Sequence, residues 1–367
     1  MRPSPTSTAF RPTRVVVAGA PAEVLVPTLP GESAASVFRH YVAQLPAQGW
    51  TGQAGILDTA TILPAVDPRH LPAVGIVVSD PSKLIPGQDT RFFELVRHVE
   101  AVGCRPVLLM PRSDLMTAQE NRVALLTGIA DCLDGVLGLG GADVDPALYG
   151  ETNRFALGVN LERDRFEAEL ALTCMERPLF MLGICRSHQL WNVAAGGSLV
   201  QDLLAEGHTR LSRNQWEFDL DPSRPLVVRG RHGRTVFENR IQVTRPSLLA
   251  EAVESKEFIT NAYHHQAVLR PGAGFRVTAR AIGAAGERPL IAATERWNVL
   301  TVQFHPEVRP EDAVERKLLS FFASRVQAAH LLRETSPASV SRRLRGAGFP
   351  AEAIRWAGHA ASLRVAA

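Results

Sequence analysis

The feature that most constrains the fold of this chain is a regular alternation between short apolar runs and longer segments of helical period, from residue 72 to residue 204. The apolar runs have the length of buried strands, and apolar residues recur at helical spacing in the segments between them. Strands that alternate with helices form a mostly parallel sheet with helices on both faces, which is an α/β fold. We predict strands at 74–78, 106–110, 135–139 and 179–184, and helices at 92–102, 121–129, 165–176 and 187–195.

The pattern changes after residue 204, where strand-like runs follow one another without helices between them. These runs predict a small antiparallel extension of the sheet. They lie at 241–244, 275–281 and 290–294, and are followed by a strand at 299–304 and an amphipathic helix at 311–329. Nearer the N-terminus, the sequence indicates a strand at 15–17 and a helix at 34–45.

The length of the chain allows one large domain with additions at both ends. It has 367 residues, of which 46% are hydrophobic, so it can bury a sizeable core. We divide it into an N-terminal extension (1–69), a main domain (70–330) and a C-terminal tail (331–367). Neither end carries a motif that reveals its role.

Charge, hydropathy and cysteine content argue against several classes of function. A net charge of +3 is small for this length and does not demand a nucleic-acid partner. No apolar run is long enough for a membrane-spanning helix or a secretion signal. The four cysteines form no CxxC pair, and the adjacent His264 and His265 lack a spaced carboxylate that would complete a metal site. We therefore expect a cytoplasmic protein with no metal, cofactor, membrane or nucleic-acid partner.

The segment that carries most chemical information is an apolar strand that runs through Gly183 and Ile184 into Cys185 and then into a helix. A sharp turn between a strand and a helix exposes a nucleophile, and Gly183 permits the close approach that the turn needs. The free N–H groups at the start of a helix favour negative charge, and so favour the thiolate. A lone cysteine at a strand end is more often a structural thiol, but the glycine spacing favours a nucleophile here.

A cysteine nucleophile needs a base and a group that orients the base, and His305 and Glu307 can supply both. They are two residues apart at a strand end, so an extended backbone points both to one side. Gly140 and Gly141 follow another strand, and their N–H groups, with that of Arg186, can form an oxyanion hole. The alternatives are a hydrogen-bonded structural histidine and a simple tight turn of glycines.

At these residues the chain resembles the class I glutamine amidotransferases, and more closely the peptidase C26 branch that includes γ-glutamyl-γ-aminobutyrate hydrolases. The resemblance covers roughly residues 70 to 328, the main domain, which it identifies as class I glutamine amidotransferase-like. It implies a flavodoxin-like core, a Cys-His-Glu triad and a glutamyl thioester intermediate. The matching segments, in chain order, are 140–146, 148–150, 163–164, 183–189, 196–199, 201–203, 261–268 and 303–307.

The resemblance also implies which residues bind the substrate. Gln189 matches the position that contacts the glutamyl group, and Tyr263 and His264 lie in the loop that lines the pocket. Three positions depart from the family pattern. Ser187 stands where glycine is usual, Ala262 where serine is usual, and Gly138-Leu139 where the strand usually ends in proline.

These observations lead to one main hypothesis and two alternatives. The main hypothesis is a stand-alone cysteine hydrolase that cleaves the γ-glutamyl amide bond of a small molecule. The first alternative is a glutaminase subunit that supplies ammonia from glutamine to a separate synthetase. The second is a binding protein for γ-glutamyl ligands that has lost turnover through Ser187. The sequence leaves open whether the chain forms a homo-oligomer.

Overall fold

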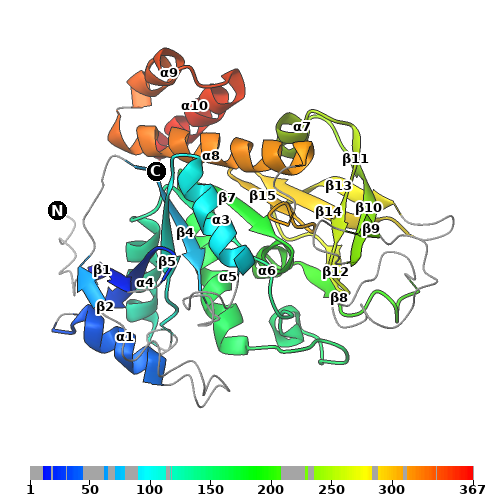
Figure 1. Ribbon diagram of the computed structural model, residues 1–367, viewed down its shortest axis with the longest axis horizontal. Coiled ribbons are helices and arrows are strands. Elements are labelled where there is room, and N and C mark those ends of the chain that lie inside the picture. The colour runs from blue at the N-terminus through cyan, green and yellow to red at the C-terminus, as the bar shows by residue number, and fades with distance from the viewer. Residues whose placement is uncertain are drawn as a thin grey trace. The chain divides into compact units, whose positions relative to one another are not determined.

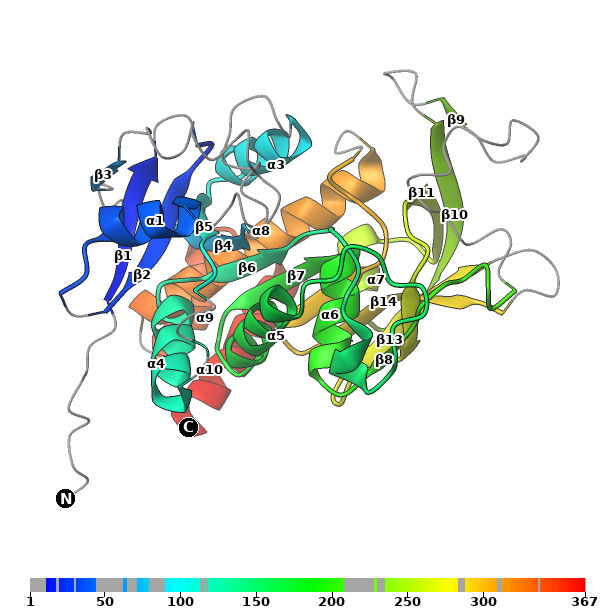
Figure 2. The same ribbon diagram turned by 90° about the horizontal axis from the view of Figure 1, so that it is seen from below.

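The structure is a computed structural model that describes residues 11–17, 20–29, 31–43, 62–64, 71–78, 90–112, 116, 118–207, 228–229, 235–282, 288–308, 312–335 and 337–366. The chain divides into two compact units, residues 1–136 and 137–367 (Figures 1 and 2). Within the described ranges, none of the helices combines the length and apolar character needed to cross a bilayer. The predicted helix ends at residues 44, 45 and 311 lie outside these ranges.

The first unit is built on parallel strands joined by helices. Strand β4 (Ala73–Val77) pairs in parallel with β5 (Arg105–Leu109) on one side and with β6 (Gly135–Gly138) on the other. Helices α3 (Thr90–Ala101) and α4 (Gln119–Ala130) connect them. The order β5–β4–β6 is how a flavodoxin-like sheet begins. The predicted strands at 74–78, 106–110 and 135–139 are confirmed within one residue at each end.

Residues N-terminal to these strands extend the same sheet. Strand β2 (Glu23–Thr28) pairs in parallel with β5, and β1 (Arg11–Val17) pairs antiparallel with both β2 and β3 (Ile62–Pro64). Helix α1 (Ala34–Ala43) buries Val37, Phe38 and Val42. The domain boundary predicted after residue 69 stays a prediction, as does that after residue 330.

The second unit continues the alternation and contains the predicted site. Helix α5 (Leu161–Met175) leads to strand β7 (Phe180–Ile184), which is followed by helix α6 (Arg186–Ala194). Strand β15 (Val299–Val302) pairs in parallel with β7, from Val299 opposite Met181 to Val302 opposite Ile184. Because parallel strands end at the same edge of a sheet, the residues that follow β7 and β15 leave the sheet side by side.

The predicted antiparallel extension is confirmed in this unit. Its strands lie in the order β11 (Glu257–Ala262), β10 (Thr235–Val243), β13 (Arg276–Ile282) and β14 (Leu290–Arg296), and β14 pairs with β15. The remaining elements are β8 (Ser198–Val200) paired with β12 (Ala267–Arg270), β9 (Val228–Arg229) beside β10, the 3₁₀ turn η4 (Pro146–Tyr149), and α7 (Leu248–Val253). The α/β class predicted from the sequence is therefore confirmed.

The C-terminal segment forms helices that pack on the second unit. Helix α8 (Ala313–Glu334) is followed by α9 (Pro337–Gly346) and α10 (Ala351–Ala366), drawn in orange and red in Figure 1. Trp356 of α10 is 6% exposed, and its ring meets Phe180 edge-on and stacks on Trp297. Its indole N–H donates to the Trp297 carbonyl at 3.0 Å. Phe180 opens β7, so α10 completes the core beneath that strand.

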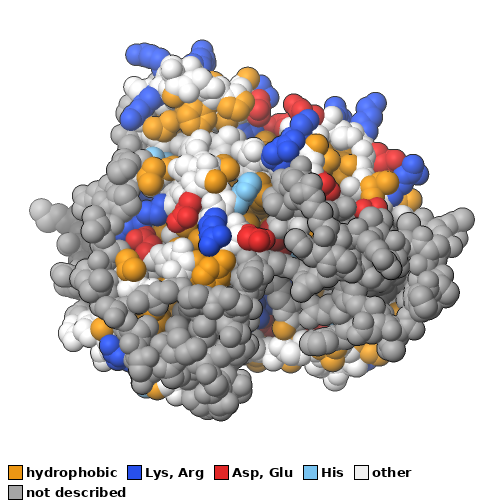
Figure 3. Space-filling view, in the orientation of Figure 1, with side chains coloured by type: hydrophobic (Ala, Val, Ile, Leu, Met, Phe, Trp, Pro, Cys, Tyr) orange, Lys and Arg blue, Asp and Glu red, His pale blue; other side chains and the backbone are white. Residues whose placement is uncertain are grey.

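Helix α9 carries basic side chains on its outer surface. Arg342, Arg343 and Arg345 of α9 are exposed, and basic side chains stand over α9 at the top of the face drawn in Figure 3. Arg343 donates to the Thr335 hydroxyl at 2.7 Å. These three arginines therefore lie on the outer side of a packed helix.

We predict that Trp356→Ala lowers the free energy of unfolding by about 3–5 kcal/mol, because it leaves a cavity against Phe180 and Trp297. Urea denaturation of the full chain measures this change. Arg355→Ala is the matched control on the same helix, since Arg355 is exposed, and it should stay within about 0.5 kcal/mol of wild type. Equal values for both variants would contradict a core role for α10.

Candidate active site

Cys185 stands at a strained turn between strand β7 and helix α6. Its backbone has φ 49° and ψ −102°, a conformation that residues with a side chain rarely adopt. The turn is fixed from the sheet side, where the Cys185 N–H donates to the Val302 carbonyl at 2.8 Å. A Cβ at Gly183 would lie 2.7 Å from the Trp191 ring, so only glycine lets β7 and α6 pack this closely. Backbone strain of this kind is concentrated at functional sites.

His305 and Glu307 follow β15 and form a close pair. The Nδ1 atom of His305 lies 2.6 Å from Oε1 of Glu307. Asn261 holds the backbone of His305 on both sides, since its Oδ1 accepts from the His305 N–H at 2.9 Å and its Nδ2 donates to the His305 carbonyl at 2.8 Å. The Tyr263 ring meets the imidazole edge-on, with centroids 5.7 Å apart. His305, predicted as the base, and Glu307, predicted to orient it, are therefore adjacent, and the backbone of His305 is firmly held.

The second ring nitrogen of His305, Nε2, is not bound by Glu307, which pairs with Nδ1. His305 Nε2 is buried and has no well-formed hydrogen bond to any described residue. Burial favours the neutral ring, but the charges of Glu307 and of Cys185 outweigh it and raise the pKa of His305 well above its ordinary value. Cys185 therefore interacts with the His305 ring, and this interaction favours the charged imidazole.

The two glycines predicted for the oxyanion hole have different neighbours. A Cβ at Gly140 would lie 2.8 Å from His305 Cε1 and 3.6 Å from Cys185 Cβ, so Gly140 lies close to the imidazole and to the Cβ of the nucleophile. A Cβ at Gly141 would lie 2.9 Å from Arg163 Nη2 and 3.2 Å from Arg186 Cδ. Arg186 is the first residue of α6, where the helix itself leaves the N–H group free.

The side chain of Arg186 is buried in an ionic cluster that joins α6 to α5. It is 1% exposed and pairs with Asp164 and, at 2.6 Å, with Glu167. Arg163 binds the other oxygen of Glu167 at 2.8 Å. Burial would raise the pKa of Glu167, but Arg186 and then Arg163 lower it to about 2. The sequence reasoning missed Glu167, although Arg163, Asp164 and Glu167 share the helix face that such a cluster needs.

Gln189 reaches the nucleophile through a second glutamine. Gln303 Nε2 lies 3.6 Å from Cys185 Sγ. Gln189 Nε2 donates to Gln303 Oε1 at 3.2 Å and to the Gln266 carbonyl at 3.1 Å. The predicted substrate contact is therefore buried and bonded within the protein. No role was predicted for Gln303. Its position directly after β15, two residues before His305, indicates that it lies near the site.

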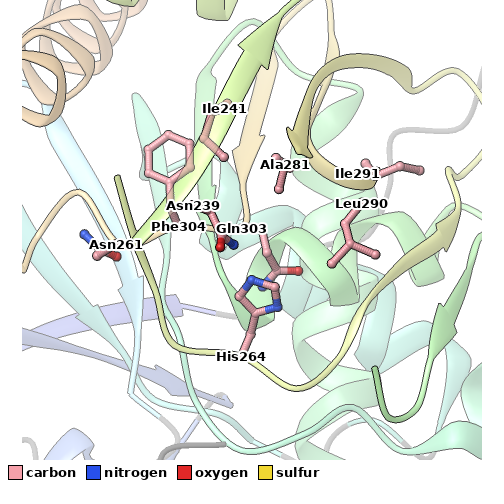
Figure 4. Close-up of a pocket in the computed structure, with 10 residues that line it drawn as sticks. Asn239, Ile241, Asn261, His264, Ala281, Leu290, Ile291, Gln303 and Phe304 are labelled. Atoms are coloured by element: carbon pink, nitrogen blue, oxygen red, sulfur yellow. The ribbon is translucent and has the colours of Figure 1, made fainter. Parts of the chain in front are cut away.

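His264 lines a small cavity beside this pair of glutamines (Figure 4). Its Nδ1 lies 2.9 Å from the Gln266 carbonyl, and the side chain is 7% exposed. Asn239, Asn261 and Gln303 also line this cavity, which has space for about one water molecule. The lining residues are Asn239, Ile241, Asn261, His264, Ala281, Leu290, Ile291, Ala292, Gln303 and Phe304.

The neighbouring His265 bridges two loops that the sequence did not connect. Its Nε2 lies 2.8 Å from Asp143 Oδ2 and its Nδ1 lies 3.2 Å from Asp202 Oδ2. Carboxylates only accept, so both ring nitrogens must carry protons to complete these bonds. Burial lowers the pKa of His265, but the two aspartates outweigh it and raise the pKa above its ordinary value. The ion pair fixes the loop that follows Gly141.

The described side chains around the site form no metal centre. Among the residues that the structure describes, no group of three or more histidine, cysteine, aspartate or glutamate side chains could hold a metal ion. The carboxylates of Asp143 and Asp202 contact different nitrogens of the His265 ring, Nε2 and Nδ1 respectively. The chemistry available here is that of a thiol, an imidazole and backbone N–H groups.

Known proteins match the part of the chain that carries these residues. A model of the peptidase C26 family matches residues 74–307. The putative glutamine amidotransferase-like protein YvdE of Lactococcus lactis subsp. lactis is 34% identical over 194 residues, which cover 52% of this chain and 74% of that protein. The gamma-glutamyl-gamma-aminobutyrate hydrolase of Escherichia coli O157:H7 is 28% identical over 207 residues, which cover 56% of this chain and 76% of that protein.

Solved structures also match. A putative GMP synthase component from Thermoplasma acidophilum covers 70% of this chain and 97% of its own length, with 14% sequence identity and a TM-score of 0.43. The CTPS glutaminase domain of Trypanosoma brucei, with bound acivicin, covers 71% of this chain and 93% of its own length, with 17% identity and a TM-score of 0.43.

We predict that Glu167→Gln lowers the free energy of unfolding at neutral pH by up to about 3 kcal/mol, because it weakens a buried ion pair. A carboxylate with a lowered pKa stabilises the fold above its ordinary pKa of about 4.5, and this contribution is lost as the pH falls toward about 2. The difference from wild type should therefore shrink in acid. Urea denaturation between neutral pH and about pH 3 measures it, with the exposed Glu162→Gln as control.

The pH dependence at His265 should have the opposite sign. A raised pKa means that the charged ring stabilises the fold at pH values below about 6.5, and that this contribution is lost as the pH rises through the folded pKa. We predict that His265→Gln destabilises the protein most in weak acid and progressively less in alkali. The same denaturation experiment checks it, and a difference that does not change with pH would rule out the imidazolium bridge.

Proposed function

Because the chain belongs to the peptidase C26 family, we propose that it is a cysteine hydrolase that cleaves γ-glutamyl amide bonds of small molecules through a glutamyl thioester. The observation that carries the proposal is the strained turn at Cys185, with φ 49°, beside the His305–Glu307 pair. Relatives named for glutamine amidotransfer and for γ-glutamyl-γ-aminobutyrate hydrolysis support the same bond type. Cys185, His305 and Glu307 would form the catalytic triad.

In the first half of the proposed reaction, the Cys185 thiolate attacks the γ-carbonyl carbon and a C–S bond forms. The carbonyl oxygen becomes an oxyanion, which accepts hydrogen bonds from backbone N–H groups of the glycine loop and of Arg186. The tetrahedral intermediate collapses, the C–N bond breaks, and the His305 imidazolium gives its proton to the leaving amine. The raised pKa of His305 supports this role, because it favours the protonated ring that donates to the leaving amine.

In the second half, water replaces the amine. Neutral His305 takes a proton from the water molecule while its oxygen attacks the thioester carbon. The C–S bond then breaks, the thiolate is restored, and glutamate leaves. Glu307 keeps the imidazole in one orientation and stabilises its charged form, as the 2.6 Å contact with Nδ1 allows.

The glutamyl group would bind on the side of Gln303. This residue contacts Cys185 and Gln189 and lines the cavity of Figure 4 together with His264. Tyr263 packs on the imidazole, so its contribution would be to position His305 as well as to line the pocket.

A second candidate is a glutaminase that delivers ammonia to a separate synthetase. Names of relatives such as glutamine amidotransferase-like protein favour it. The chemistry at Cys185 would be the same, and only the leaving amine and the partner differ. Ammonia release from glutamine that requires an added partner protein would favour this candidate over the stand-alone hydrolase.

We predict that the purified chain releases glutamate from γ-glutamyl-p-nitroanilide or from a member of a panel of γ-glutamyl amines. Hydroxylamine should intercept the thioester and yield γ-glutamyl hydroxamate, because it is a better nucleophile than water. Cys185→Ser should reduce kcat by about 10³-fold or more, since it removes the nucleophile. Glutamate and hydroxamate formation are both measured directly.

The matched control is Cys132→Ser, which changes a partly exposed thiol of the first unit. It should retain wild-type activity. If wild type and Cys185→Ser release equal amounts from every compound, the hydrolase proposal is wrong and a binding role gains support. A panel that includes acidic, basic and aromatic amines identifies the leaving group.

A further inference from the structure

Ser187 occupies a buried position that links helix α6 to the glycine loop. It is the second residue of α6 and is 2% exposed. Its hydroxyl donates a hydrogen bond to the Leu139 carbonyl at 2.8 Å. Leu139 directly precedes Gly140, so this bond joins the helix that begins after the nucleophile to the loop that packs against it.

The space for Ser187 is created by Gly138, which belongs to the Gly138-Leu139 pair that stands where the family strand usually ends in proline. A Cβ at Gly138 would lie 2.6 Å from both Cβ and Oγ of Ser187, and 2.6 Å from Trp191 Cζ2. A Cβ essentially never lies this close to an atom to which it is not bonded, so a side chain at residue 138 would displace the serine. Gly138 and Ser187 are therefore complementary, and Ser187 does not crowd the turn.

The hydrogen bond has a consequence for the next N–H group. The Leu139 carbonyl and the Gly140 N–H belong to one planar trans peptide, in which the two groups point in opposite directions. A carbonyl held toward Ser187 therefore directs the Gly140 N–H away from the Ser187 hydroxyl. Residue 140 is also the glycine that lies close to Cys185 and His305. The Gly141 N–H belongs to the following peptide, and Gly141 packs against Arg163 and Arg186.

We infer that Ser187 is a positioning residue that aims the Gly140 N–H at the oxyanion formed during attack by Cys185. The inference rests on the proposed function, and it selects Gly140 over Gly141 as the oxyanion donor. It also means that Ser187 promotes turnover, whereas the binding-protein alternative holds that turnover was lost through Ser187. A donor that acts only on the oxyanion lowers the barrier without strengthening substrate binding.

Ser187→Ala removes the hydroxyl and keeps the Cβ, and Ser187→Gly also restores the residue expected from the family pattern. With γ-glutamyl-p-nitroanilide as the probe, both variants of the full chain should lose kcat by about 10- to 100-fold, because the donor is no longer held in place. KM should change by less than about twofold. A kcat equal to or above wild type in Ser187→Gly would overturn the inference.

Ser324→Ala is the matched control, since Ser324 also donates to a backbone carbonyl at 2.8 Å, from within α8. Its kcat and KM should equal those of wild type. Crystal structures of wild type and Ser187→Ala provide a readout that needs no substrate. A rotated Leu139–Gly140 peptide in the variant is expected, and an unchanged peptide would reject the inference. If wild type is inactive but the Leu139–Gly140 peptide is rotated in Ser187→Ala, the proposed function is rejected and the positioning effect of Ser187 on the peptide stands.

Discussion

Strands β7 and β15 run in parallel with Ile184 opposite Val302, and the chain leaves both strands at the same edge of the sheet. The Cys185 N–H donates to the Val302 carbonyl, so the turn begins one residue after the register is set. A slip of one residue would reverse the face on which each side chain lies and would separate the thiol from the imidazole. The candidate site therefore depends on this pairing before it depends on any single side chain.

Polar contacts then hold the strained turn in place. Arg186, directly after Cys185, is buried between Asp164 and Glu167, and Asn261 binds both sides of the His305 backbone. Buried charges are costly unless they are paired, so the arginine is stable only where both carboxylates meet it. Such a cluster can hold the unfavourable backbone of Cys185, because surrounding contacts over-determine the turn.

Ser187 and the Gly138-Leu139 pair both depart from the family pattern, and the two departures are complementary in space. Each alone suggests a damaged site, since a side chain at 187 needs space and a glycine at 138 loosens a strand end. Together they fit, because the serine occupies the volume that a Cβ at 138 would need and its hydroxyl binds the Leu139 carbonyl. Their combined effect is a stiffer connection between α6 and the glycine loop.

The amino-acid sequence alone predicts the strands and helices of the α/β core, because apolar periodicity is a local property. It also determined the candidate residues Cys185, His305 and Glu307, since the glycine spacing and the two-residue offset are visible without a fold. The contacts between distant segments are visible only in the folded structure. They join Arg186 to Glu167, Gln303 to Cys185, His265 to two aspartates, and Trp356 to Phe180. These pairs lie far apart along the chain or on different elements, and no local pattern specifies which partner burial and charge will select.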